Sequence, residues 1–263
     1  MPADLLHLPP IAVAETLAGG PGIVDLWYWF YEPAMTSAMV ETGLSWITIE
    51  EHDRYRRFRF ERDRRLFLAT RVLVRDVLSR YAAAAPADWR FVADQSGKPR
   101  VALPAVSPRL HFNLTNTPGL VVCGVSVAHE AIGVDAERVD RTVNYTSLAA
   151  RFFATVEAED LRSRPPDEWP RRFFEYWTLK ESYLKARGLG LAVPLDQCAF
   201  ALGGRDIRIS FTAPGLEAAH WRFASIDAAP GYLIAVGADT GGHPLSLRAQ
   251  AFSPAGAAPH LGQ

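Results

Sequence analysis

The sequence has 263 residues, of which 49% are hydrophobic and 22% are charged, and its formal net charge is −1. This length can bury a large core, as one domain or as two halves of ordinary size, and the near-neutral charge argues against general binding to nucleic acids or membranes. Two cysteines, Cys123 and Cys198, cannot form a disulfide framework. We therefore expect a cytoplasmic protein, without a membrane partner.

The first half of the chain shows strand and helix patterns in turn. Residues 22–31, GIVDLWYWFY, are rich in β-branched and aromatic side chains and predict a strand. Residues 44–58 and 62–81 predict helices, and ten of the 25 arginines fall between residues 54 and 80. Further strands are predicted at residues 89–93, 99–103, 110–114, 120–128 and 131–139.

The second half, from residue 124, repeats this order of elements. Short helices are predicted at 144–153 and 156–162, and a longer helix is predicted to begin at residues 165–167, with Asp167 as its cap, and to end at Gly188. Two hairpins follow at 198–211 and 221–238, and the remaining residues are rich in Gly, Pro and Ala. We therefore predict an α+β fold with an N-terminal half (1–123), a C-terminal half (124–238) and a flexible tail (239–263).

Two charged residues interrupt the apolar stripe of the long helix. Glu181 and Lys185 lie one turn apart on the side that also carries Phe173 and Trp177. The chain has only three lysines, and two of them, Lys180 and Lys185, belong to this helix. A solvated Glu–Lys pair would contribute only about 0.3–0.5 kcal/mol, whereas buried charges require partners. The pattern therefore indicates either an exposed pair or a functional site.

Residues 131–137, AIGVDAE, place two carboxylates on one face of a strand. Asp135 and Glu137 are two residues apart, so their side chains point the same way and repel each other unless a cation lies between them. Mg²⁺ favours such oxygen ligands, and Glu181 would supply a third. The alternative is an exposed polar strand face.

Two turns and an arginine-rich helix could meet phosphates. Lys98 and Pro99 follow Gly97 at a predicted hairpin, and Thr115 and Asn116 end a predicted strand. Solvated turn chemistry explains each of these equally well. The arginines that begin at Arg54 either cover a solvated helix face or dock phosphate groups. The sequence has neither a phosphate-binding Walker loop nor a nucleophile elbow.

Four motifs resemble those of the 4′-phosphopantetheinyl transferases of the larger, surfactin-synthetase-activating (Sfp) type. They are, in chain order, GKP, FNLTNT, GVDAE and WTLKESYLKARGLGL. The resemblance covers roughly residues 23–238. It implies two similar α+β halves in a pseudo-twofold arrangement, with coenzyme A and Mg²⁺ in the cleft between them. It also implies transfer of phosphopantetheine to a serine of an apo acyl or peptidyl carrier protein, with release of adenosine 3′,5′-bisphosphate.

The resemblance assigns roles to individual residues. Asp135, Glu137 and Glu181 match the metal-binding acids, and Glu181 also matches a candidate base. Lys185 matches a lysine on the diphosphate, so the expected catalytic set is Glu181, Lys185 and Asp135. The positions that match contacts to coenzyme A are Arg54, Lys98, Pro99, Thr115 and Asn116, together with Lys185.

Asn116 departs from the family pattern, because Thr115-Asn116 stands where Ser-His is usual. Asparagine donates a hydrogen bond to a phosphate but cannot carry a charge, which weakens the expected contact with the 3′-phosphate. A non-catalytic module that binds coenzyme A or carrier protein is the alternative function, and three converging carboxylates argue against it. Nucleic-acid binding through the arginine-rich helices is disfavoured by the near-neutral net charge. We expect a monomer.

Overall fold

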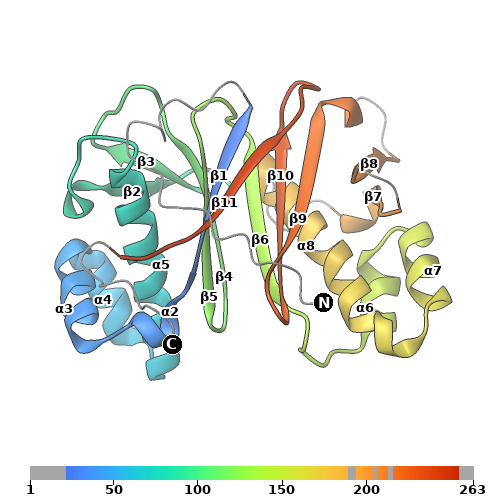
Figure 1. The fold of residues 1–263 in the computed structure, drawn as a ribbon, viewed down its shortest axis with the longest axis horizontal. Helices are drawn as coiled ribbons and strands as arrows, with labels where there is room; N and C mark the ends of the chain where they lie inside the picture. The colour runs from blue at the N-terminus through green and yellow to red at the C-terminus, as the bar shows by residue number, and fades with distance from the viewer. Residues whose placement is uncertain (1–21, 189–193, 204–205, 213–215, 255–263) are drawn as a thin grey trace, which may run out of the picture.

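The computed structural model describes residues 22–188, 194–203, 206–212 and 216–254. Two sheets stand next to each other in the middle of the molecule, and helices cover their outer sides (Figure 1). Helices α3–α5 flank the sheet of the first half, and α6–α8 flank the sheet of the second half. In the described part of the chain, no helix combines the length and apolar character needed to cross a bilayer.

The first half begins with a strand and continues with a group of helices. Its elements are β1 (Ile23–Phe30), α2 (Tyr31–Ala34), α3 (Ser37–Trp46), α4 (Ile49–Arg57), α5 (Glu61–Ser79), β2 (Arg90–Ala93), β3 (Pro99–Leu103), β4 (His111–Thr117) and β5 (Leu120–Ser126). The single helix predicted at 44–58 is divided in two. Thr48 interrupts it, because its hydroxyl accepts from Glu51 N while the Glu51 carboxylate accepts from Thr48 N, so a new helix begins there.

The second half contains the long helix predicted from the sequence. Its elements are β6 (Ile132–Arg138), α6 (Tyr145–Phe152), α7 (Thr155–Ser163), α8 (Trp169–Arg187), β7 (Cys198–Ala201), β8 (Arg208–Phe211), β9 (Trp221–Ala229) and β10 (Tyr232–Asp239). The last strand described is β11 (Ser246–Ala251). Helix α8 ends at Gly188, which adopts the left-handed conformation with φ 63°.

The two halves repeat one topology. The first sheet has the order β11-β1-β5-β4 and the second has the order β6-β10-β9, so β1-β5-β4 corresponds to β6-β10-β9. In each half a 19-residue helix, α5 or α8, is followed by a separate two-stranded hairpin, β2–β3 or β7–β8. The predicted α+β class with two similar halves is confirmed, and the pseudo-twofold relation between the halves stays a prediction.

Two predicted boundaries differ from the structure. The expected division between residues 123 and 124 cuts through β5, and the chain passes into the second half between β5 and β6. The flexible tail predicted from residue 239 is wrong where β11 pairs in parallel with β1. Arg248 of β11 donates to both carboxylate oxygens of Asp25, at 2.5 and 2.8 Å, and so fastens the strand. Residues 1–21 and 255–263 lie outside the described part.

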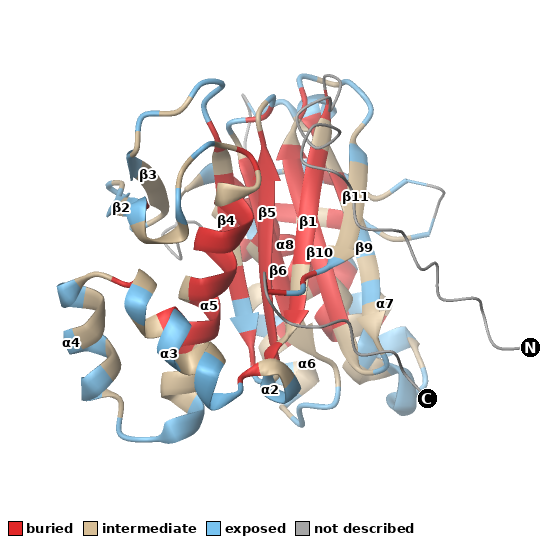
Figure 2. Ribbon diagram, turned by 60° about the vertical axis from the view of Figure 1, so that its left-hand side comes forward, coloured by how far each residue is buried: buried red, intermediate tan, exposed pale blue. Residues whose placement is uncertain are grey.

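The core has three apolar layers. One fills the space between α5 and the first sheet, one lies between the two sheets, and one lies between the second sheet and α8. Figure 2 shows the buried residues concentrated in the central strands and in α5, whereas α3 and α4 are largely exposed or half-buried. A strand buried on both faces is nearly all apolar, as in β5.

Candidate active site

A glycine pair brings α8 unusually close to the second sheet. Gly133 of β6 lies opposite Gly237 of β10. A Cβ at Gly133 would lie 2.0 Å from Ser182 O and 2.4 Å from Ala186 N, so any larger residue would push strand and helix apart. This close approach puts the acids of β6 against the charged residues of α8. The close packing of strand and helix therefore explains the glycine of the GVDAE motif.

Residues from both halves meet at Lys185. Its ammonium donates to Asp135 Oδ1 at 2.6 Å and to Thr115 Oγ1 at 3.1 Å, and the Thr115 hydroxyl donates to the same carboxylate oxygen at 3.2 Å. Strand β4 is held beside β6, because Asn113 Oδ1 accepts from Val134 N at 2.8 Å. Three elements remote in sequence, β4, β6 and α8, thus converge on one charged cluster.

Asp135, Glu137 and Glu181 face a common cavity of about 610 Å³, which we call the aromatic cavity. Its other lining residues are Arg151, Phe152, Trp177, Pro194 and Leu195. Burial raises the pKa of Glu181 and of Glu137, and the Asp135 carboxylate raises both further. The carboxylates are therefore close enough to repel one another electrostatically.

The three carboxylates that were predicted to bind a metal do not converge on one point in this structure. Among the described residues, no three His, Cys, Asp or Glu side chains stand close enough together to enclose a metal ion. Asp135 Oδ1 is taken by Lys185, and Glu137 Oε2 accepts from Arg141 at 2.6 Å. Asp135 Oδ2 is buried and has no hydrogen-bond partner. An acceptor atom of this kind is what a cation would satisfy.

A second cavity, of about 280 Å³, also has Glu181 in its lining, and we call it the hairpin cavity. Its lining residues are Ser96, Gly97, Lys98, Pro99, Asn113, Leu114, Glu181, Leu184, Lys185 and Gly188. They come from the β2–β3 hairpin and β4 in the first half and from α8 in the second half. Glu181 thus lines both this cavity and the aromatic cavity.

Lys98 connects the two halves at the rim of the hairpin cavity. Its ammonium donates to the carbonyls of Ile132 at 2.8 Å and Ala186 at 3.4 Å, and burial lowers its pKa to about 8. Pro99 lies beside it and lines the same cavity. Both residues predicted from the GKP motif therefore lie at the boundary between the halves, with Glu181 and Lys185.

Asn116 and Arg54 stand apart from these cavities. Asn116 is exposed on β4, next to the buried Thr115, and it lines neither cavity. Arg54 is exposed on α4, with its guanidinium 5.5 Å from the centroid of the Phe67 ring. Two other arginines of this region, Arg71 and Arg75, both pair with Glu51. Much of the arginine-rich window is therefore engaged within the first half.

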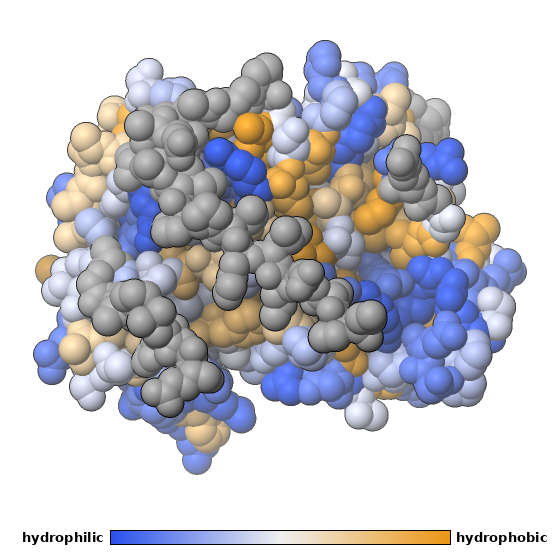
Figure 3. All heavy atoms as spheres, viewed as in Figure 1, coloured by the Kyte–Doolittle hydropathy of each residue, from blue (hydrophilic) through white to orange (hydrophobic). Residues whose placement is uncertain are grey.

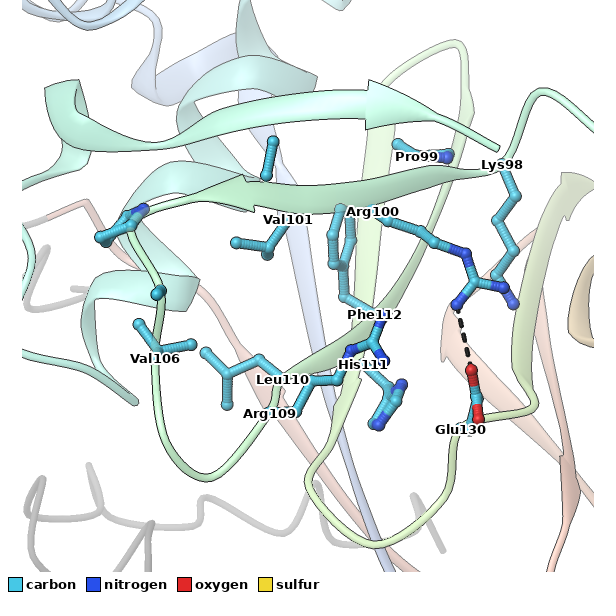
Figure 4. A pocket seen from close by; sticks show the side chains of 13 residues that line it. Lys98, Pro99, Arg100, Val101, Val106, Arg109, Leu110, His111, Phe112 and Glu130 are labelled. Atoms are coloured by element: carbon cyan, nitrogen blue, oxygen red, sulfur yellow. Dashed lines mark hydrogen bonds and ion pairs between the residues drawn. The ribbon is translucent and has the colours of Figure 1, made fainter. Parts of the chain in front are cut away.

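The other side of the β2–β3 hairpin carries a small basic cavity of about 170 Å³ (Figure 4). Lys98, Arg100, Arg109 and His111 line it together with Glu130. Arg100 is held by two carboxylates, Asp94 at 3.0 Å and Glu130 at 3.2 Å, so much of this positive charge is neutralised locally.

The sequence did not reveal the aromatic wall opposite the acids. Phe152 and Trp177 meet edge to face, with ring centroids 5.9 Å apart, and Arg151 lies beside them. Trp177 was recognisable as part of the helix stripe, but Phe152 belongs to another helix, and no spacing links the two residues. Only the fold shows that they share a cavity with Glu181.

Comparison with known proteins agrees with this geometry. The profile of the 4′-phosphopantetheinyl transferase superfamily matches residues 131–237, and the profile of the N-terminal region of a 4′-phosphopantetheinyl transferase matches residues 32–127. The 4′-phosphopantetheinyl transferase HetI of Nostoc sp. is 37% identical over 168 residues, which are 64% of this chain and 70% of the relative. The 4′-phosphopantetheinyl transferase Sfp of Bacillus subtilis is 32% identical over 196 residues, 74% of this chain and 84% of the relative.

The chain therefore belongs to the 4′-phosphopantetheinyl transferase superfamily, and it is a transferase. Membership of this family favours the enzyme over a non-catalytic binding module. Among solved structures, the holo-[acyl-carrier-protein] synthase of Thermotoga maritima gives a TM-score of 0.34 at 16% identity, over 41% of this chain and 61% of that chain. That likeness is too low to define the fold by itself.

Proposed function

We propose that this enzyme transfers the phosphopantetheine arm of coenzyme A to a serine of an apo acyl or peptidyl carrier protein. The observation that carries the proposal is the position of Glu181, which lines both the hairpin cavity and the aromatic cavity. Phosphoryl transfer needs the leaving and the attacking oxygens on opposite sides of phosphorus. Two cavities that share one carboxylate in their lining provide separate places for the leaving group and for the attacking serine.

The nucleotide end of coenzyme A belongs in the hairpin cavity. Lys98 and Pro99 from one half and Lys185 from the other provide two cations and an apolar ring for a phosphorylated nucleotide. Thr115 and Lys185 adjoin each other, so both can contact the diphosphate. Asn116 and Arg54 lie outside this cavity. They are proposed to contact the 3′-phosphate where the bound nucleotide extends from the cavity into solvent.

The acceptor serine of the carrier belongs in the aromatic cavity. The acids of this cavity lie where the serine hydroxyl would approach phosphorus. Glu181 lines both cavities, so its carboxylate is placed to accept the proton of the attacking serine. Glu181 is therefore the residue that we assign to the serine proton.

The carboxylate oxygens of the aromatic cavity are of the type that Mg²⁺ prefers as ligands. Asp135 Oδ2 is a buried oxygen without a partner, and Glu137 and Glu181 offer further carboxylate oxygens to the same cavity. These three residues would hold the ion. When bound, Mg²⁺ neutralises charge on the diphosphate and makes its phosphorus a better electrophile.

The proposed transfer needs no nucleophile from this chain, because the carrier supplies it. The serine oxygen of the carrier forms a bond to the phosphorus that bears the pantetheine arm, and its proton passes to Glu181. The bond from that phosphorus to the bridging oxygen breaks, and adenosine 3′,5′-bisphosphate leaves. Lys185 stabilises the charge that develops on the leaving phosphate. Thr115 and Asp135 orient the Lys185 ammonium.

We also propose that the enzyme acts as a cytoplasmic monomer. Residues of both halves of one chain complete the charged cluster, so no second copy is needed. Cys123 and Cys198 are both free and buried, which suits a reducing compartment.

Mass spectrometry of carrier proteins tests the function directly. The parent enzyme is incubated with coenzyme A, Mg²⁺ and a panel of apo carrier proteins from fatty-acid, polyketide and non-ribosomal peptide synthesis. We expect at least one carrier to gain the mass of one phosphopantetheine group on its serine. Variants of that carrier with serine replaced by alanine provide the control. Binding of coenzyme A without any mass gain would contradict the proposal and support a binding module.

A further inference from the structure

A buried ion pair lies behind the aromatic cavity. Lys180 and Glu157 have fully buried side chains, and their charged groups are 2.7 Å apart. The Lys180 ammonium also donates to the carbonyls of Leu195 at 2.7 Å and Cys198 at 2.5 Å. All three of its hydrogens therefore have acceptors.

The Glu157 carboxylate is equally engaged. Oε2 accepts from Ala154 N at 2.9 Å, at the junction of α6 and α7, and Oε1 accepts from Phe200 N at 2.7 Å on β7. The pair thus connects the start of α7, the middle of α8, the turn before β7 and β7 itself. On the face seen in Figure 3, hydrophilic side chains gather over α6 and α7, on the outer surface of this region.

Packing alone does not explain this pair. Burying two charges has a large desolvation cost, and apolar residues of similar size often give equal or greater stability. The chain otherwise uses arginine for nearly all its cations, yet it has a lysine here. The compact ammonium fits three acceptors around one point, which the broad guanidinium does not.

Both walls of the aromatic cavity are attached to this pair. Leu195, whose carbonyl accepts from Lys180, lines the cavity together with Pro194. Ala154, whose amide donates to Glu157, lies two residues after Phe152, which lines the cavity on another side. Lys180 directly precedes Glu181 in α8, so the same helical turn carries the anchor and the proposed base.

We propose that the Lys180–Glu157 pair is a positioning device that fixes both walls of the aromatic cavity relative to Glu181 and thereby governs how the carrier serine is presented. This inference rests on the proposed function. It assigns to the pair a role in carrier recognition and none in coenzyme A binding, because Leu195 and Phe152, whose segments the pair holds, line the aromatic cavity and do not line the hairpin cavity.

The test separates positioning from stability with a double variant. Single variants Lys180→Met and Glu157→Gln each leave one buried charge without its partner, and we expect both to unfold at lower temperature. Lys180→Met/Glu157→Gln removes both charges and keeps an acceptor for Phe200 N, so we expect most of the stability to return. A purely structural pair would then show restored activity as well. A positioning pair leaves kcat/KM for the carrier at least tenfold low, with KM for coenzyme A within twofold of the parent.

Two further variants keep the inference testable. Lys180→Arg retains the charge but not its shape, and it should also lower kcat/KM for the carrier while sparing KM for coenzyme A, even if the double variant fails to fold. Arg248→Met serves as a matched control, because it breaks a partly buried ion pair far from both cavities and should cost stability without separating the two substrates.

The outcomes are distinct. Absence of transfer by the parent would overturn the proposed function, and with it this inference. Transfer by the parent, together with parent-like carrier kinetics in a folded Lys180 variant, would overturn the inference alone. Equal changes in KM for the carrier and for coenzyme A would also overturn it, because they would indicate a disturbance common to both cavities.

Discussion

At the scale of single residues, Lys185 makes one set of contacts in the structure and is assigned another in the proposed reaction. In the structure its ammonium pairs with Asp135 and Thr115, whereas the proposed reaction requires it at the leaving phosphate. The two roles are compatible, because an ammonium has three hydrogens and, among the described residues, Lys185 donates to two acceptors. A third hydrogen could therefore be donated to a phosphate oxygen in the hairpin cavity.

Lys185→Ala should lower kcat by more than it raises KM for coenzyme A, by about an order of magnitude or more. The reason is that charge on the leaving phosphate is greatest in the transition state, where the lost contact matters most. Lys185→Arg should recover only part of the loss, since the guanidinium is aimed differently. Steady-state kinetics with a fixed carrier measures both constants, and parent-like turnover in both variants would show that Lys185 is only a structural cation.

Glu181→Gln should raise the free energy of unfolding at neutral pH in metal-free protein. Burial and Asp135 raise the pKa of Glu181 in the folded state, so the ionised side chain is less favourable there than in the unfolded chain. The advantage of the variant should shrink as the pH falls toward the unfolded pKa, where both states bind the proton. Urea unfolding of variant and parent between pH 5 and 8, in the presence of a chelator, measures the difference in their free energies of unfolding. A difference that does not change with pH across that range would contradict the prediction.

Asn116→His should be tolerated, because the side chain is exposed. If Asn116 meets the 3′-phosphate, an imidazolium should tighten coenzyme A more than dephospho-coenzyme A, and the gain should be larger at about pH 6 than at pH 8. Calorimetric titration with both ligands at both pH values provides the comparison. Equal responses would show that Asn116 does not face that phosphate.

At the scale of elements, the contact between β6 and α8 determines whether the acids and Lys185 meet. Gly133→Ala should cost about 1–3 kcal/mol of stability, because the new methyl group would overlap with the backbone of α8. It should also reduce activity in the remaining folded protein, since the helix would move away from Asp135. Gly203→Ala is the matched control, because a methyl group added there would have no atom within 4 Å. Similar losses in both variants, by thermal unfolding and transfer rate, would refute the packing argument.

The sequence predicted some elements well, for physical reasons that can be stated. Helix α8 has a clear helical period and a glycine at its end, so both its type and its C-terminus at Gly188 were found. The division of α3 from α4 was missed, although Thr48 and Glu51 form the capping pattern that marks a helix start. Strand β11 was missed because it is half-buried, and the residues that make it a strand belong to β1, more than two hundred positions earlier.

The charged site was predicted in part. Strand alternation places Asp135 and Glu137 on one face, and in the structure both line one cavity together with Glu181. Their role as metal ligands stays a prediction. The pairing of Lys185 with Asp135, the position of Lys98 at carbonyls of the other half and the Lys180–Glu157 pair were not foreseen. Each depends on which strand packs against which helix, and local periodicity contains no such information.

At the scale of the whole molecule, an apolar layer joins the two halves, in addition to the residues that line the cavities. The apolar layer between the sheets contains fully buried residues of both, such as Leu120 and Val122 of β5 and Ile132 and Val134 of β6. Neither half can expose this face to water without a large hydrophobic cost. The halves are therefore expected to unfold together, although the topology is a duplication.

Arg248→Ala should lower the unfolding temperature and loosen β11 without changing KM for either substrate. Its guanidinium bridges to Asp25, whose carboxylate also accepts from Tyr81 at 2.7 Å, so the loss would leave a buried carboxylate with one partner fewer. Hydrogen exchange of the β1 and β11 amides measures the loosening. Unchanged protection of both strands would show that the ion pair does not hold the edge.

The parallel pairing of β1 with β11 has a consequence for synthesis of the chain. The ribosome makes β1 first among the described strands and β11 last, so the edge of β1 stays unpaired until almost all of the protein has emerged. The segment from β6 to β10, by contrast, completes its own three-stranded sheet and its covering helix from consecutive elements. Folding during translation is therefore expected to complete the second sheet before the first sheet receives its edge strand β11.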